Sequence, residues 1–268
     1  RSDQIFQDKL NHASMIDGAL LSRAKLFRYS HASTESLRAA LAGKPSGRKL
    51  VLTESVFSMD GDIAPLAEIA SLSARKKVCL AVDDAHGFGV FGDSGAGVLE
   101  ALDLDQEQVP IMMATFGKAI GCAGAFVAGS KELIELMVQK ARPYIYSTAL
   151  APALAVAATK ALFLLSEEPW RREHLRALIT RFRTGAEQTG LVLMESSSPI
   201  QPLIAGSAAR AQAMSKALYE SGIFITAIRP PTVPINSSRL RITICASHTT
   251  EDVDLLLETL GACGLNNN

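Results

Sequence analysis

Two residues that can hold or move protons follow an apolar segment of the sequence. Asp83 and His86 are three positions apart, directly after the run at 78–82 (VCLAV). If that run is a buried strand, both side chains leave it at its carboxyl end, where ligands of open α/β sheets bind. An acid and a histidine at this place could serve a cofactor or a substrate. The same pattern also fits an acid that caps a turn beside a surface histidine.

A lysine flanked by small residues follows a second apolar run. Lys118 lies in the segment 115–121 (TFGKAIG), after the run at 111–115 (IMMAT). Lysine is seldom buried without a partner, and burial would lower its pKa and leave a neutral amine for Schiff-base chemistry. The spacing does not match the GxxxxGK[ST] phosphate loop. A solvated lysine in a turn is the alternative.

Hydroxyl groups and a pair of arginines complete the set of candidate residues. The segment 53–62 (TESVFSMDGD) leaves another apolar run, and its hydroxyls, Ser58 among them, could contact a cofactor or substrate. Farther along, Arg239 and Arg241 are two positions apart and share one face of a predicted strand. A guanidinium there could bind a carboxylate through two parallel hydrogen bonds, and an exposed cationic strand face is the alternative.

The elements that must position these residues alternate between apolar runs and amphipathic helices in the first half of the chain. This rhythm predicts an α/β fold with a doubly wound, mostly parallel sheet. Residues 1–10 are polar and show no strand pattern, so the sequence is expected to begin inside a domain. The predicted strands are 49–53, 78–82, 111–115 and 123–128, and the predicted helices are 65–76 and 131–141.

The pattern changes after about residue 150, where long helices are followed by mixed strands and helices. We therefore expect a large domain over residues 1–150, and a linking helix with a smaller α+β domain over residues 151–268. The predicted helices are 149–166, 170–190, 208–221 and 251–261, and the predicted strands are 191–194, 200–204, 223–227 and 240–245.

The composition excludes several classes of protein. The 268 residues are 48% hydrophobic and 20% charged, which is typical of a folded globular protein. Lys plus Arg and Asp plus Glu both number 27, so the zero net charge argues against a nucleic-acid partner. The apolar run at 149–165 is interrupted by polar residues and is too short for a membrane span. The four cysteines lack metal-ligand or disulfide-framework spacing, so we expect no metal and a reducing, cytoplasmic location.

Taken together and in this order, the motifs resemble the α-oxoamine synthases, which are pyridoxal-phosphate (PLP) enzymes with the fold of aspartate aminotransferase. The resemblance covers nearly the whole chain but begins inside the family's pattern. The family's N-terminal part, with a glycine-rich segment and a histidine stacked on the cofactor, is therefore expected to be missing. The matching segments are Asn11-His12-Ala13-Ser14, TESVFSMDGD, VDDAHGFGVFG, TFGKAIG, YIYSTAL and RLRITICASHT.

The resemblance implies a role for each candidate residue. Lys118 would hold PLP as a Schiff base and act as the catalytic base, and Asp83 would pair with the pyridinium nitrogen. His86 and Ser58 would contact the ring's phenolic oxygen, and Thr115 would bind the phosphate. The resemblance places the remaining candidates at a partner's phosphate (Ser147, Thr148), at the substrate carboxylate (Arg241) and near the mouth of the site (Arg229, His12).

Within the family, the segment 226–234 (TAIRPPTVP) resembles the members that make an intermediate of biotin biosynthesis. This implies a decarboxylative Claisen condensation of L-alanine with a pimeloyl thioester, carried on coenzyme A or an acyl-carrier protein. The active form would be a homodimer with shared active sites. Two alternatives stay open: a glycine C-acyltransferase of the same family, and a catalytically silent fragment or subunit that keeps the fold.

Overall fold

The computed structural model describes residues 2–43 and 47–265 and divides the chain into two compact units. The first unit comprises residues 1–57 and 64–169, and the second comprises residues 58–63 and 170–268. The chain therefore passes between the units at 57/58, 63/64 and 169/170. The sequence analysis places a domain boundary at residue 150, and this boundary stays a prediction because compactness alone does not show which part folds independently.

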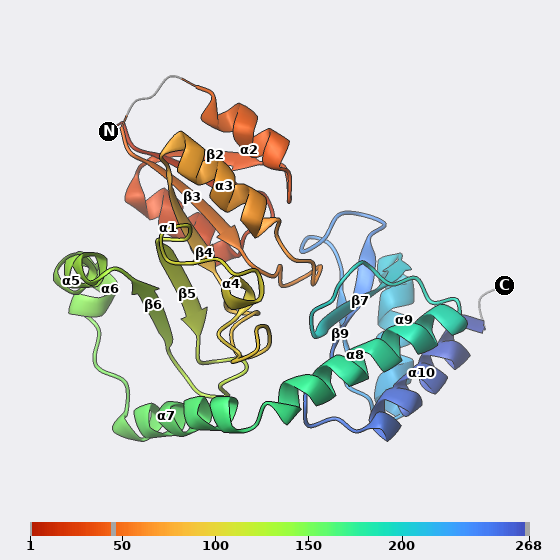
Figure 1. The fold of residues 1–268 in the computed structure, drawn as a ribbon. Coiled ribbons are helices and arrows are strands. Elements are labelled where there is room, and N and C mark those ends of the chain that lie inside the picture. Colours follow the sequence, from red (N-terminus) through yellow and green to blue (C-terminus); the bar gives the residue numbers. More distant parts are fainter. Residues whose placement is uncertain (1, 44–46, 266–268) are drawn as a thin grey trace. The chain divides into compact units, whose positions relative to one another are not determined.

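The first unit contains a six-stranded sheet in the order β2-β1-β3-β4-β5-β6 (Figure 1). The first five of these strands are parallel to their neighbours and β6 pairs antiparallel with β5, so the predicted mostly parallel α/β sheet is confirmed. The strands are β1 (Gln4–Asp8), β2 (Lys25–Tyr29), β3 (Lys49–Glu54), β4 (Cys79–Asp83), β5 (Ile111–Thr115) and β6 (Ala125–Gly129).

Strand β1 corrects the expectation for the first ten residues, which carry no strand pattern. It lies between β2 and β3, and its residues Ile5 to Asp8 are all buried. Pairing on both sides satisfies the backbone groups of this polar segment, and Phe6 stacks on Phe27 with ring centroids 4.9 Å apart. Tertiary pairing therefore outweighs the local pattern here.

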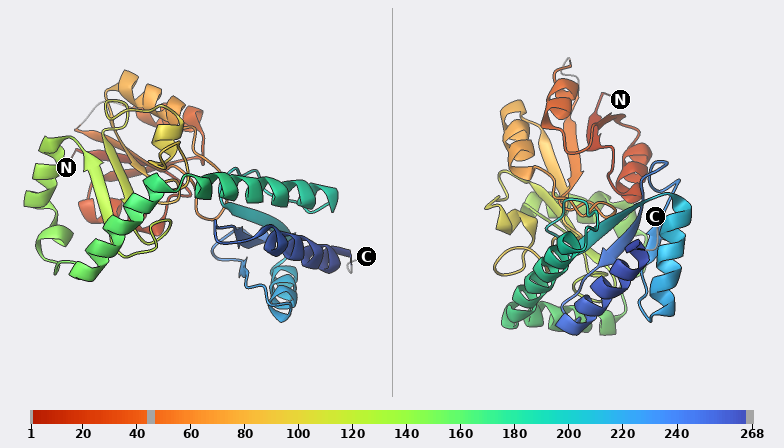
Figure 2. Two further views of the ribbon diagram at one scale, coloured as in Figure 1. Left: turned by 60° about the horizontal axis from the view of Figure 1, so that its bottom comes forward. Right: turned by 90° about the vertical axis from the view of Figure 1, so that its right-hand side faces the viewer.

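Helices cover both faces of this sheet. Helices α2 and α3 lie together on one face, and α1 lies on the other (Figures 1 and 2). Helices α5 and α6 have no buried residue, and α7 buries only Ala158 among those described. The helices are α1 (Ala13–Ser22), α2 (Thr34–Leu41), α3 (Leu66–Lys76), α4 (Val98–Ala101), α5 (Lys131–Lys140), α6 (Arg142–Ile145) and α7 (Pro152–Glu167).

The second unit is a three-stranded antiparallel sheet in the order β7-β9-β8, with three helices. Helices α8 and α10 lie side by side (Figure 2). A strand predicted at 191–194 is wrong, because only an isolated bridge between Leu193 and Leu203 forms there. The elements are α8 (Trp170–Gln188), β7 (Ile200–Gly206), α9 (Ala208–Glu220), β8 (Thr226–Ile228), β9 (Ser238–Thr243) and α10 (Thr250–Leu265). No helix within the described residues combines the length and apolarity needed to cross a bilayer.

Candidate active site

Acidic side chains gather where the parallel strands of the first unit end. Glu54 and Asp83 are paired in register as the last residues of β3 and β4. The amide of Ala85 donates a 2.9 Å hydrogen bond to the Asp83 carboxylate. Burial raises the pKa of Asp83, while the Ala85 hydrogen bond and the charges of Lys118 and His12 act in the opposite direction. The site therefore contains a partly desolvated carboxylate under the influence of a nearby amine.

Lys118 lies in the connection between β5 and β6. The Thr115 hydroxyl closes this turn, because it accepts from the Gly117 amide at 3.1 Å and donates to the Gly124 carbonyl at 3.1 Å. Gly117, Lys118 and Ala119 are all exposed at this turn, which corresponds to the solvated alternative for Lys118 in this chain. The charge of Lys118 partly opposes the rise in the pKa of both Asp83 and Glu54, and all three residues lie in the first unit.

The turn after β4 carries His86 and is stabilised by the buried residue Asp84. Its carboxylate accepts from the Ser55 hydroxyl and, at 3.0 Å, from the Val98 amide. Burial raises the pKa of Asp84 to about 7. Gly97 has a φ of 109°, and a Cβ there would lie 1.8 Å from the Asp84 carboxylate, so only glycine fits. His86 is half-buried in this turn, three residues beyond Asp83.

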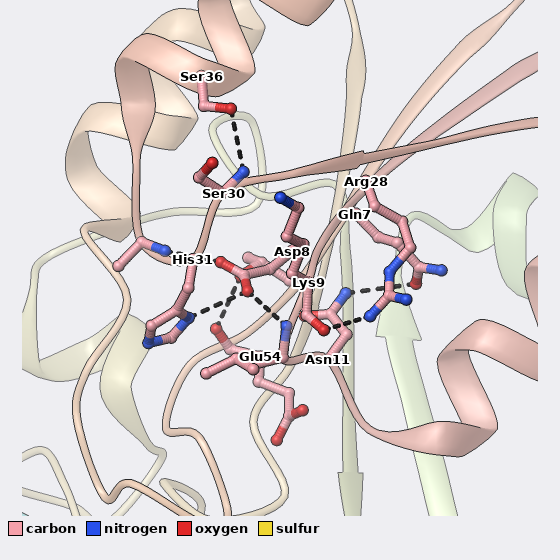
Figure 3. Close-up of polar contacts among 12 residues, drawn as sticks. Gln7, Asp8, Lys9, Asn11, Arg28, Ser30, His31, Ser36 and Glu54 are labelled. Carbon is pink, nitrogen blue, oxygen red and sulfur yellow. Dashed lines mark hydrogen bonds and ion pairs between the residues drawn. The ribbon is translucent and has the colours of Figure 1, made fainter. Parts of the chain in front are cut away.

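A buried polar cluster that the sequence did not reveal lies at the ends of β1, β2 and β3 (Figure 3). The Asp8 carboxylate is 1% exposed, lies 3.0 Å from Nδ1 of His31, and accepts from the amides of Leu10 and Ala32, each at 2.8 Å. Glu54 is 3% exposed. The available signal was an acid at the end of each strand: Glu54 follows the KLVLT run and is the last residue of β3, and Asp8 is the last residue of the unrecognised β1.

His12 is joined to this cluster through its backbone. Its amide donates to the Glu54 carboxylate, and its side chain caps helix α1, with Nδ1 2.8 Å from the Ser14 hydroxyl. The neighbouring Asn11 side chain donates to the Leu52 carbonyl at 3.0 Å. These bonds fix the segment that carries the exposed His12 ring at the same edge of the sheet as Asp83.

Glu54 makes the stability of the first unit depend on pH. Burial and the charge of Asp83 raise its pKa to about 7, so the folded protein holds a proton that the unfolded chain loses near pH 4.5. The proton on Glu54 stabilises the folded state fully below that lower pKa, and this stabilisation is lost as the pH rises through about 7.

We expect the free energy of unfolding of the parent to decline as the pH rises, and Glu54→Gln to remove up to about 3 kcal/mol of this decline. Urea unfolding at pH 5 and pH 8 measures it, and Glu258→Gln, at an exposed acid on α10, is the control. Equal declines in the parent and in Glu54→Gln would contradict the assignment.

The other predicted cofactor residues of the first unit, Ser147 and Thr148, are exposed in the segment between α6 and α7. In the sequence they lie between large apolar residues that are exposed in this chain. The exposed fractions are 67% for Tyr144, 72% for Tyr146, 51% for Leu150, 69% for Val156 and 58% for Phe163. These exposed residues, from Tyr144 to Phe163 in the sequence, are together called the α6–α7 face below.

The second unit contains the remaining predicted residues. Arg241 is half-buried on β9, and its Nε donates a 2.6 Å hydrogen bond to the Ser58 carbonyl. Burial lowers the pKa of Arg241. Arg239, on the same strand, is instead paired with Asp60, so the two arginines have different partners. Arg229 is exposed and directly follows β8, the strand next to β9.

Comparison with known proteins places this arrangement in a family. The model of the family "Aminotransferase class I and II" matches residues 1–260. The 8-amino-7-oxononanoate synthase of Cellvibrio japonicus is 53% identical over 261 residues, which are 97% of this chain and 66% of that protein. The chain thus spans slightly less than two thirds of the length of this curated relative.

Two solved structures have closely similar folds. A serine palmitoyltransferase with a PLP internal aldimine has a TM-score of 0.94 at 32% identity, over 98% of this chain and 67% of its own. An 8-amino-7-oxononanoate synthase from Francisella tularensis has a TM-score of 0.85 at 33% identity, over 97% of this chain and 75% of its own. With a family model that matches residues 1–260 of 268, the chain belongs to the class I and II aminotransferase family.

Proposed function

We propose that the chain belongs to a PLP-dependent 8-amino-7-oxononanoate synthase. The reaction joins L-alanine to a pimeloyl thioester, with release of carbon dioxide and the free thiol carrier, as a step of biotin biosynthesis. The observation that carries this proposal is the position of Lys118 in the turn after β5, near the Asp83 carboxylate at the end of the neighbouring strand β4. The 53% identity to a synthase of that name supports the choice of substrates. The four free cysteines fit a reducing location, and we propose the cytoplasm.

The residues of the first unit fit PLP by their chemistry. When bound, PLP supplies an electron sink that stabilises negative charge on the amino-acid Cα. Lys118, an exposed residue, would hold the cofactor and then move a proton at Cα. Asp83 would face the ring nitrogen and keep a proton there, because a partly buried carboxylate strongly favours a cationic partner. His86 and Ser58 would donate to the phenolic oxygen, and Thr115 would bind the phosphate.

Substrate binding falls to cationic side chains in this proposal. The bond from Arg241 to Ser58 uses only Nε, so both terminal nitrogens can bind the alanine carboxylate side by side. Arg229 and His12, which are both exposed, would contact the acyl thioester. The condensation forms a bond between the alanine Cα and the thioester carbonyl carbon and breaks the C–S bond. Loss of the alanine carboxyl group as carbon dioxide follows, and Lys118 returns the proton to Cα.

The proposed active form is a homodimer. Several large apolar side chains of the α6–α7 face are exposed to solvent, which is unusual for a surface without a partner. Ser147 and Thr148 lie within this face, so a second copy seated there would receive their hydroxyls near its cofactor phosphate. This accounts for two predicted cofactor residues that are exposed in the single chain.

Steady-state assays test the proposed activity and separate it from a glycine C-acyltransferase. Alanine or glycine is paired with pimeloyl or acetyl thioesters, on coenzyme A and on an acyl-carrier protein. We expect the alanine and pimeloyl pair to give the highest kcat/KM on at least one carrier. A preference for glycine with the acetyl thioester would favour the acyltransferase. A stably folded protein that binds no PLP and turns over none of these substrate pairs would favour the silent subunit.

A further inference from the structure

A short segment of the chain leaves the first unit and packs with the second. Residues 58–63 belong to the second unit, whereas residues 57 and 64 on either side belong to the first. The amide of Ala64 donates to the Ser55 carbonyl at 2.9 Å, so the residues before and after segment 58–63 are hydrogen-bonded to each other. Segment 58–63 begins with Ser58, to which the proposed function assigns a cofactor contact.

Three side chains of the second unit bind segment 58–63 along its length. Arg241 donates to the Ser58 carbonyl at 2.6 Å, Arg239 pairs with Asp60, and the Ser196 hydroxyl donates to the Gly61 carbonyl at 2.8 Å. Gly61 has a φ of 72°, and a Cβ there would lie 2.4 Å from the Ile200 carbonyl. The segment therefore packs closely against β7 and β9.

The Arg239–Asp60 pair is the ion pair among these contacts, and it is largely buried. The Arg239 side chain is 6% exposed and that of Asp60 is 16% exposed. Arg239 also donates from Nε to the Ser237 carbonyl at 3.1 Å and from Nη1 to the Met194 sulfur at 2.9 Å. A buried ion pair contributes little net stability compared with apolar residues, but removing one partner leaves a costly unpaired charge. Such a pair therefore fixes geometry more than it adds stability.

Arg239 and Arg241 are two residues apart on β9 and so lie on the same face of the strand. One binds Asp60 and the other binds the carbonyl of Ser58, two residues earlier in segment 58–63. Two adjacent contacts between one strand and one segment remove the freedom to slide or rotate that a single contact leaves. Misplacement of a substrate-binding group by about 1 Å can cost about 10²-fold in rate.

We propose that Arg239 and Asp60 form a positioning pair that locks segment 58–63 onto β9 and thereby fixes Ser58 relative to the carboxylate-binding Arg241. Neither residue touches the substrate in this proposal. The inference rests on the proposed function for the roles of Ser58 and Arg241, but the locking itself is a property of the second unit.

The test uses Asp60→Asn, which keeps the size of the side chain and removes its charge. Hydrogen–deuterium exchange of the peptide that spans 56–64 reports the locking directly. Titration of the PLP-loaded protein with alanine, followed by absorbance, gives the Kd of the amino acid. We expect faster exchange in that peptide and an alanine Kd about tenfold higher, with the lysine-bound PLP band and the KM of the thioester unchanged.

Arg181→Met and Asp254→Asn are the matched controls. They break an ion pair of the same type in the same unit, with nitrogen–oxygen distances of 2.6 Å, whose side chains are about half exposed and lie on α8 and α10. We expect both readouts to stay at the parental values in these variants. Arg239→Lys keeps the positive charge but loses the geometry of the guanidinium, and we expect an intermediate rise in the alanine Kd.

The outcomes separate this inference from the proposed function. Parental exchange at 56–64 in Asp60→Asn, or an alanine Kd within twofold of the parent, overturns the positioning pair even if the enzyme is active. If Asp60→Asn does not fold, Arg239→Lys decides by the same two readouts. If the parent binds neither PLP nor alanine, the proposed function fails, and the exchange of segment 58–63 alone then supports or overturns the locking.

Discussion

Replacing Lys118 with alanine is expected to abolish the visible absorbance of bound PLP and to lower kcat by at least about 10³-fold. The amine would both hold the cofactor and move the proton at Cα, and no other lysine is coupled to Asp83 in the described residues. Lys118 is exposed, and the Thr115 hydroxyl holds its turn through the Gly117 amide and the Gly124 carbonyl. The variant should therefore fold with the thermal stability of the parent, measured by circular dichroism.

Lys131→Ala is the control for this experiment. Lys131 is an exposed lysine at the start of α5, on the same unit, and its 3.8 Å ion pair with Glu135 is a surface contact. Both absorbance and kcat should match the parent. A Lys118→Ala protein that retains the band and the turnover would show that the amine has another role.

Replacing Asp83 with asparagine is expected to lower kcat by about 10³-fold while PLP remains attached. A neutral amide cannot keep the ring nitrogen protonated, whereas Lys118 is untouched. Within the described residues, the Asp83 side chain accepts one hydrogen bond, from the Ala85 amide, and the asparagine oxygen can still accept it. The loss should therefore appear in turnover and not in folding.

Asp103→Asn is the matched change at an exposed acid, where asparagine tolerates the backbone φ of 52°. Steady-state kinetics and the absorbance spectrum are compared for the two variants. A kcat for Asp83→Asn within tenfold of the parent would exclude Asp83 as the partner of the ring nitrogen.

The strands that carry the site could be predicted because their apolar runs are nearly continuous. The runs at 49–53, 78–82 and 111–115 correspond to β3, β4 and β5, neighbouring strands that are partly buried in the sheet. Locating these strands also predicts which residues share the site, because the carboxyl ends of parallel strands meet at one edge of a sheet. Asp83 and Lys118 were identified in this way.

The parts that could not be predicted depend on contacts between distant segments. β1 is polar in sequence and becomes a central strand only by pairing on both sides. The burial of Asp8 and Glu54 follows from that pairing and from the His31 and His12 contacts, which are 23 and 42 residues away in sequence. The exposure of Lys118 depends on the shape of the turn between β5 and β6, and its residue types do not reveal that shape.

The most direct test of the central claim is to identify which lysine holds the cofactor. The protein is incubated with PLP, reduced with borohydride and digested, and the pyridoxyl-bearing peptide is sequenced by mass spectrometry. We predict a single labelled residue, Lys118, with labelling lost in Lys118→Ala. Labelling of a different lysine, or no stoichiometric labelling of protein that is shown to be folded, would contradict the proposed function.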